Sequence, residues 1–124
     1  MNFYKCAHCG NIIAYISDSG VRCQCCGEEM KPLIPNNTDA AGEKHLPVIT
    51  VKDKIVTVTV GAVEHPMLEA HHIAWILLET KAGRQRKTLK PGEKPVAEFA
   101  LTEGDEAVAA YEYCNLHGLW KAEV

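Results

Sequence analysis

Residues 55–60 read IVTVTV, and this short stretch decides the fold class. Every residue in it is β-branched, a side-chain type that fits an extended backbone better than a helix. Val56, Val58 and Val60 alternate with other residues, so one face of an extended segment would be continuous valine. The stretch therefore predicts a β-strand with one buried face.

Six further segments around this stretch also have strand character. Residues 72–80 (HIAWILLET) are apolar on both faces, as in a buried strand, whereas residues 84–89 are polar and suit a sheet edge. The other expected strands are residues 46–51, 96–101, 109–115 and 119–124. Glycine and proline punctuate these segments, which is typical of a sandwich or barrel. The alanine-rich residues 105–113 leave a short helix open as an alternative.

The first 35 residues form a separate compositional block. Five of the six cysteines lie within residues 6–26, and the turn-forming residues 35–39 suggest a linker. A block of this length buries too little apolar surface to fold without a metal or disulfides. We therefore expect a mostly β protein with a small metal domain at residues 1–35 and a sandwich or barrel of about seven strands at residues 36–124.

Composition restricts the class of partner and the compartment. The chain has 124 residues, 47% of them hydrophobic, and a formal charge of −3, which gives no reason to expect nucleic acid or a membrane surface as a partner. No segment approaches the ~20 apolar residues of a membrane span, and residues 1–6 lack the features of a signal peptide. A cytoplasmic location is expected, where thiols stay reduced and cysteines more often bind metal than form disulfides.

The cysteine block contains the spacing of a four-thiolate metal site. Cys6 and Cys9 form a C-x2-C pair on a turn, which lets two sulfurs converge on one ion. The second pair comes from Cys23, Cys25 and Cys26, and spacing leaves open which two of these three bind. Spacing also leaves open whether the ion is a structural zinc or a redox-active iron.

A second group of donors consists of histidines around the remaining cysteine. His45, His65 and His71 fall at expected strand ends or turns, and Cys114 with His117 forms a C-x2-H pair. Four imidazoles and one thiolate suit iron better than structural zinc, and an octahedral ion would keep one position open. His71 and the adjacent His72 would point to opposite faces of a strand, so only one of them can face the ion.

Together these motifs resemble the desulfoferrodoxin family, the two-iron superoxide reductases. Residues 4–11 (YKCAHCGN) and 25–30 (CCGEEM) resemble the family's desulforedoxin-like domain. The segments that resemble its catalytic domain are residues 43–47 (EKHLP), 64–67 (EHPM), 71–73 (HHI) and 114–120 (CNLHGLW). The resemblance covers nearly the whole chain and implies an immunoglobulin-like sandwich and a homodimer.

The resemblance also implies two iron sites. The first iron would be held by Cys6, Cys9, Cys25 and Cys26. The catalytic iron would be held in a plane by His45, His65, His71 and His117, with Cys114 as axial ligand. Glu43 would ligate the oxidised iron, and Lys44 would stand beside the open position. Cys23, and His72 in place of an expected aromatic residue, depart from the pattern.

The implied activity is the one-electron reduction of superoxide to hydrogen peroxide, with electrons from a soluble donor such as rubredoxin. Two alternatives compete with it. A zinc ribbon fused to a β-sandwich binding module would explain the cysteine block and treat the histidines as incidental. An oxygen-using non-haem iron enzyme would more often use two histidines and one carboxylate.

Overall fold

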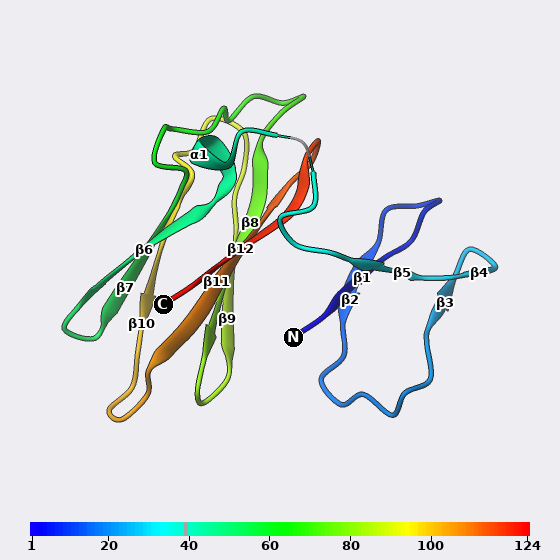
Figure 1. Ribbon diagram of the computed structural model, residues 1–124, viewed down its shortest axis with the longest axis horizontal. Coiled ribbons are helices and arrows are strands. Elements are labelled where there is room, and N and C mark those ends of the chain that lie inside the picture. Colours follow the sequence, from blue (N-terminus) through cyan, green and yellow to red (C-terminus); the bar gives the residue numbers. More distant parts are fainter. Residues whose placement is uncertain (39) are drawn as a thin grey trace. The chain divides into compact units, whose positions relative to one another are not determined.

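The computed structural model describes residues 1–38 and 40–124 and divides them into two compact units, Met1–Ile34 and Pro35–Val124. Both are built of β-strands, and the one helix among the described residues is the four-residue α1 (Gly42–His45) (Figure 1). The expectation of a mostly β protein is confirmed. Within the same residues, no helix has the length and apolar character that a bilayer crossing requires.

The first unit consists of short strands around a very small core. Its strands are β1 (Phe3–Lys5), β2 (Ile12–Ala14), β3 (Gln24–Cys25), β4 (Glu28–Glu29) and β5 (Lys31–Leu33). One sheet has the order β2-β1-β5, and β3 pairs with β4 as a hairpin. Its core cluster of buried residues is Tyr4, Cys6 and Met30. So small a core fits the expectation that this unit depends on a bound metal.

The second unit is a sandwich of two antiparallel sheets. Its strands are β6 (Pro47–Lys52), β7 (Ile55–Val60), β8 (Ile73–Thr80), β9 (Arg84–Thr88), β10 (Val96–Ala100), β11 (Ala107–Cys114) and β12 (Gly118–Glu123). One sheet has the order β10-β7-β6 and the other β12-β11-β8-β9. The seven strands expected from the sequence are confirmed in the described residues.

The core lies between the two sheets and follows the predicted alternation. Val56, Val58 and Val60 on β7 are all 0% exposed, and they pack with Ile76 of β8 and Phe99 of β10. The polar segment β9 is an edge strand, as expected. Residues 107–114 form a strand and not the alternative helix, because β11 pairs on both sides, with β8 and with β12.

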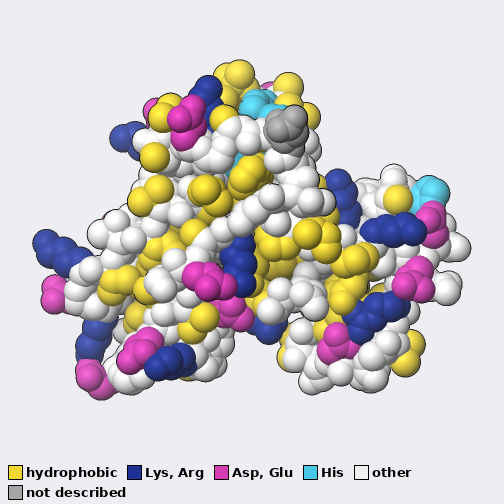
Figure 2. Space-filling view, in the orientation of Figure 1, with side chains coloured by type: hydrophobic (Ala, Val, Ile, Leu, Met, Phe, Trp, Pro, Cys, Tyr) yellow, Lys and Arg dark blue, Asp and Glu magenta, His cyan; other side chains and the backbone are white. Residues whose placement is uncertain are grey.

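Two local features differ from the expectation. His45 does not begin the first sandwich strand but ends α1, directly before β6. Of the expected linker, residue 39 lies outside the described residues, and Asn36 is tied to the sandwich: its backbone N–H donates to the Leu119 carbonyl at 3.0 Å. On the face in Figure 2, acidic and basic side chains are interspersed, as the small net charge suggests.

Candidate metal centres

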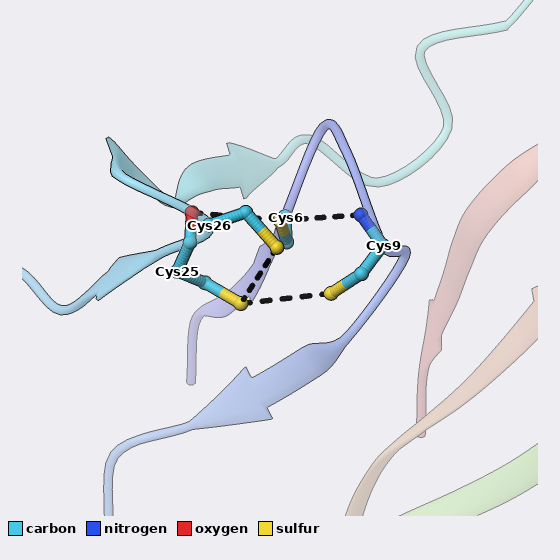
Figure 3. Close-up of side chains that lie close together, drawn as sticks. All are labelled: Cys6, Cys9, Cys25 and Cys26. Atoms are coloured by element: carbon cyan, nitrogen blue, oxygen red, sulfur yellow. Dashed lines mark hydrogen bonds between the residues drawn. The ribbon is translucent and has the colours of Figure 1, made fainter.

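Four cysteine sulfurs gather in the first unit. Cys6 and Cys9 come from the turn after β1, and Cys25 and Cys26 come from the β3–β4 hairpin; all four point toward one another (Figure 3). Their sulfurs lie within 4.8 Å of one another. The Cys9–Cys25 and Cys25–Cys26 sulfur distances are 3.5 Å and 4.0 Å. A tetrahedral ion with metal–sulfur bonds of about 2.3 Å needs sulfurs about 3.8 Å apart, so the group fits one.

Backbone conformation explains how two adjacent cysteines share one ion. Cys26 has a φ of 53°, in the left-handed region, which turns its side chain back toward that of Cys25. Cys23 is exposed and outside the group, and its backbone N–H donates to the Tyr15 hydroxyl at 2.8 Å. The structure thus assembles Cys25 with Cys26, the pair that the family resemblance implied.

The protonation behaviour of the four cysteine sulfurs favours a bound cation. Backbone N–H groups of Cys9 and His8 donate to the Cys6 sulfur and lower its pKa to about 6. Hydrogen bonds with the sulfurs of Cys9, Cys6 and Cys25 raise the pKa of Cys26 to about 12. Four thiolates this close repel one another unless a metal ion neutralises them, and an ion would deprotonate all four.

The second group lies at one end of the sandwich. The turn after β7 carries His65, the segment before β8 carries His71, and β11 ends at Cys114. Because these sheets are antiparallel, the end of β11 lies beside the start of β8, where Cys114 pairs with Ile73. Donor atoms of His45, His65, His71 and Cys114 lie within 4.8 Å of one another.

Backbone hydrogen bonds fix the helix that carries His45 to the same end of the sandwich. The N–H of Val63 donates to the Glu43 carbonyl at 3.0 Å, and the N–H of Gly61 donates to the Leu46 carbonyl at 3.1 Å. Gly61 has a φ of 83°, and a Cβ there would lie 2.7 Å from the Lys44 carbonyl oxygen. Only glycine permits this close approach of the His65 turn to α1.

The four imidazoles form a square. Neighbouring ring centroids are 4.6 Å (His45–His65), 4.7 Å (His65–His71), 5.1 Å (His71–His117) and 4.9 Å (His117–His45) apart. The diagonal from His45 to His71 is 6.4 Å. Neighbouring rings are steeply inclined, at 77° to 89°, whereas the diagonal pair is inclined by 29°. In this arrangement one nitrogen of each ring can point toward a common centre.

Hydrogen bonds on the outer sides of two rings fix which nitrogens face inward. Nδ1 of His45 lies 2.8 Å from the Ala41 carbonyl oxygen, and Nδ1 of His65 lies 2.7 Å from that of Pro66. A carbonyl only accepts, so each Nδ1 carries the proton and each Nε2 has a bare lone pair. These two Nε2 atoms are 3.1 Å apart with no proton to share. Two lone pairs at that distance repel each other, and a cation between them would remove the repulsion.

The remaining two imidazoles agree with a central cation. Nε2 of His71 is buried and has no hydrogen-bond partner among the described residues. His117 faces the group with its other nitrogen: Nδ1 lies 3.1 Å from His45 Nε2 and 3.8 Å from the Cys114 sulfur. An unpaired buried nitrogen is costly, and a metal ion would satisfy it.

Burial sets the protonation states of the histidine and cysteine donors. Burial lowers the pKa of His65 to about 4 and lowers those of His45 and His71, so these imidazoles are neutral ligands at neutral pH. Burial raises the pKa of Cys114, although backbone N–H groups of Leu116 and His117 donate to its sulfur. A bound cation would deprotonate this thiol.

Glu43 and Lys44 are exposed on α1, directly before His45. The positive charge of Lys44 contributes to the lowered pKa values of His45 and His71, which places that charge near the group. The Glu43 carboxylate is not among the donors that lie together in the described residues.

Three other residues with titratable side chains lie outside the two donor groups. His72 points away: its Nδ1 lies 3.0 Å from the Leu68 carbonyl oxygen, which decides the choice between His71 and His72. His8 lies inside the Cys6–Cys9 turn, where it is exposed, and its Nε2 lies 2.6 Å from a carboxylate oxygen of Glu28. Sequence reasoning missed Glu112, which is 0% exposed; strand alternation places it on the Cys114 face of β11 and could have revealed it.

Comparison with known proteins gives consistent results. The family model described as Desulfoferrodoxin matches residues 37–123. The desulfoferrodoxin of Nitratidesulfovibrio vulgaris is 49% identical over 120 residues, which cover 97% of this chain and 94% of that protein. The desulfoferrodoxin of Syntrophotalea carbinolica is 46% identical and covers 99% of this chain and 96% of that protein.

Among solved structures, the superoxide reductase of Treponema pallidum superposes with a TM-score of 0.84 at 38% identity, covering 98% of each chain. The resemblance drawn from the motifs is therefore confirmed. Because the family model spans most of the chain and close relatives match almost all of it, the chain belongs to the desulfoferrodoxin family.

Proposed function

We propose that the chain is a superoxide reductase, an oxidoreductase that reduces superoxide by one electron to hydrogen peroxide. The observation that carries this proposal is the square of four imidazoles beside a buried cysteine sulfur. Each turnover consumes one superoxide, one electron and two protons and releases one hydrogen peroxide. Relatives named superoxide reductase, at 38% identity over 98% of the chain in one solved structure, support the proposal.

Iron is the proposed metal at both centres. Structural zinc takes four ligands, whereas the second group offers five, His45, His65, His71, His117 and Cys114, in a mixture that suits iron. When bound there, iron supplies one-electron redox chemistry and one open coordination position. The four imidazoles would hold it, and the Cys114 thiolate would donate electron density to it.

Two residues on α1, Glu43 and Lys44, are proposed to act on the anion and on the metal centre. The Lys44 ammonium is exposed, and its charge acts on the histidine group, so it can attract the superoxide anion and stabilise negative charge that develops on it. The neighbouring Glu43 carboxylate is proposed as a further ligand that would bind oxidised iron. Both roles come from the family resemblance and from their place directly before His45.

The first centre, with Cys6, Cys9, Cys25 and Cys26, is proposed to hold iron in a domain of residues 1–35 and to serve a structural and auxiliary role. Residues 36–124 would form the catalytic domain. The electron donor is proposed to be a soluble protein such as rubredoxin. A homodimer is proposed from the family resemblance. A cytoplasmic location is proposed because all six cysteines are free.

Metal content and reaction stoichiometry test the proposal. Protein purified without added metal should contain two irons per chain and little zinc. With a reduced donor present, it should yield one hydrogen peroxide per superoxide, whereas a dismutase yields one per two. Zinc in the first centre and no metal in the second would favour the alternative of a zinc ribbon with a binding module.

A further inference from the structure

The inward-facing histidines are not all held in the same way. His45 and His65 are each oriented by a hydrogen bond from their own Nδ1 to a backbone carbonyl, at 2.8 Å and 2.7 Å. Among residues 1–38 and 40–124, no ring nitrogen of His71 has a hydrogen bond of this kind. The position of the His71 ring therefore depends on its contacts with the neighbouring imidazoles and on the way its backbone is held.

One neighbour holds the two peptide groups that flank His71. The Asn115 side chain accepts a hydrogen bond from the His72 N–H through Oδ1 at 2.9 Å. Its Nδ2 donates to the Ala70 carbonyl at 3.0 Å. In addition, the backbone N–H of Asn115 donates to the His72 carbonyl at 3.2 Å. His71 itself pairs with Leu68 in an isolated bridge.

These bonds lie where regular strand pairing stops. The ladder between β8 and β11 shifts register between Tyr113 and Cys114, and β11 ends at Cys114. The carboxamide of Asn115 has the donor and acceptor of a peptide group, so it continues the pairing past the end of the strand. The side chain of Asn115, the residue after Cys114, is therefore bonded to the peptide groups on both sides of His71.

We propose that Asn115 is a positioning residue that fixes the distance and direction of His71 relative to Cys114. The carboxamide bridges the β11 end, which carries the thiol, and the segment before β8, which carries the imidazole. Without it, the segment around His71 keeps the Leu68 bridge and the backbone bond from Asn115 to the His72 carbonyl. It also keeps the contacts of His72 Nδ1 with the carbonyl oxygens of Leu68 and Glu69, neither of which links the segment directly to the Cys114 strand. This inference rests on the metal-binding part of the proposed function.

The structure offers a matched control on the same sheet. Asn36 pairs with the backbone of Lys121 in the same two-point manner: Nδ2 donates to its carbonyl at 3.1 Å, and Oδ1 accepts from its N–H at 2.9 Å. Asn36 has a φ of 59°, so glycine can replace it without backbone strain. Asn36→Gly therefore removes an equivalent pair of hydrogen bonds from a strand that carries no inward-facing donor.

The test compares Asn115→Ala, Asn115→Asp and Asn36→Gly in the full chain with Co²⁺ as the probe. Co²⁺ binds thiolate and imidazole ligands, and its absorption distinguishes the four-cysteine centre from the histidine–cysteine centre. We expect both Asn115 variants to bind Co²⁺ at the histidine–cysteine centre roughly tenfold to a hundredfold more weakly, with a shifted thiolate-to-cobalt band. The added negative charge in Asn115→Asp would by itself favour a cation, so weaker binding there must come from geometry.

Three controls separate positioning from general stability. The four-cysteine centre should bind Co²⁺ equally in all variants, and Asn36→Gly should keep wild-type affinity and spectrum at both centres. Tryptophan fluorescence confirms folding, since Trp75 and Trp120 both lie in the second unit. The inference is overturned if the Asn115 variants keep wild-type affinity and spectrum, or if Asn36→Gly loses as much. Failure of the superoxide reaction in the wild type would refute the proposed function and leave this comparison intact.

Discussion

The buried carboxyl of Glu112 gives the sharpest prediction about stability. Glu112 is 0% exposed, and neither of its oxygens has a hydrogen-bond partner among the described residues. Burial raises the pKa of this carboxyl from 4.5 to about 9. The folded protein therefore holds Glu112 protonated at neutral pH, whereas the unfolded chain releases that proton above its ordinary pKa. The perturbation is Glu112→Gln, which keeps the size and polarity of the side chain and removes the titration.

The sign follows from proton linkage. Between pH 4.5 and about 9 the folded state binds one proton more than the unfolded state, so the free energy of unfolding falls as pH rises. The loss is about 1.4 kcal/mol for each pH unit. It amounts to about 3 kcal/mol at pH 7 and less than about 1 kcal/mol at pH 5. Glu112→Gln should therefore match the wild type near pH 5 and become more stable by about 3 kcal/mol at pH 7.

Guanidinium titrations followed by tryptophan fluorescence measure this difference. Both tryptophans lie in the second unit, so the signal reports its unfolding. The wild type and Glu112→Gln are compared at equal metal content from pH 5 to pH 8. Under these conditions the titration of the histidines affects both proteins equally. Glu98→Gln on β10, an exposed carboxylate, is the matched control and should show no such trend. A stability difference between Glu112→Gln and wild type that stays constant across this range would refute the reasoning.

Four other predictions concern the metal centres and the core. Cys114→Ser should abolish superoxide reduction while circular dichroism still shows the sandwich; surviving activity would exclude the axial thiolate. Lys44→Ala should slow the superoxide reaction severalfold and flatten its dependence on ionic strength, measured by pulse radiolysis; rates with unchanged salt dependence would remove Lys44 from the mechanism. Cys9→Ser should lose metal from the first centre only, measured by elemental analysis. Phe99→Ala should lower the free energy of unfolding of the second unit by about 3–5 kcal/mol, because Phe99 is 1% exposed in the core.

Much of the fold was predictable because the strands are locally consistent. The alternation in residues 55–60 is reproduced by β7, whose three valines are completely buried. The polarity of residues 84–89 predicted an edge strand, which β9 is. Alanine-rich residues 105–113 were ambiguous because alanine favours helices. This segment forms strand β11 because it pairs with two neighbouring strands, and no local sequence pattern shows such pairing.

The sequence by itself determined the chemistry of this protein: the types of donor, their division between two blocks, and the motifs that carry the family resemblance. The resemblance also implied which donors bind each ion, whereas spacing left two choices open that only the tertiary structure resolves. It selected Cys25 over Cys23 through the left-handed turn at Cys26, and His71 over His72 through the contacts of the adjacent loop. It also buried the Glu112 carboxyl where no described residue offers it a hydrogen bond. Residue types follow from the chain itself, whereas distances between segments far apart in sequence are fixed only when sheets pair and pack.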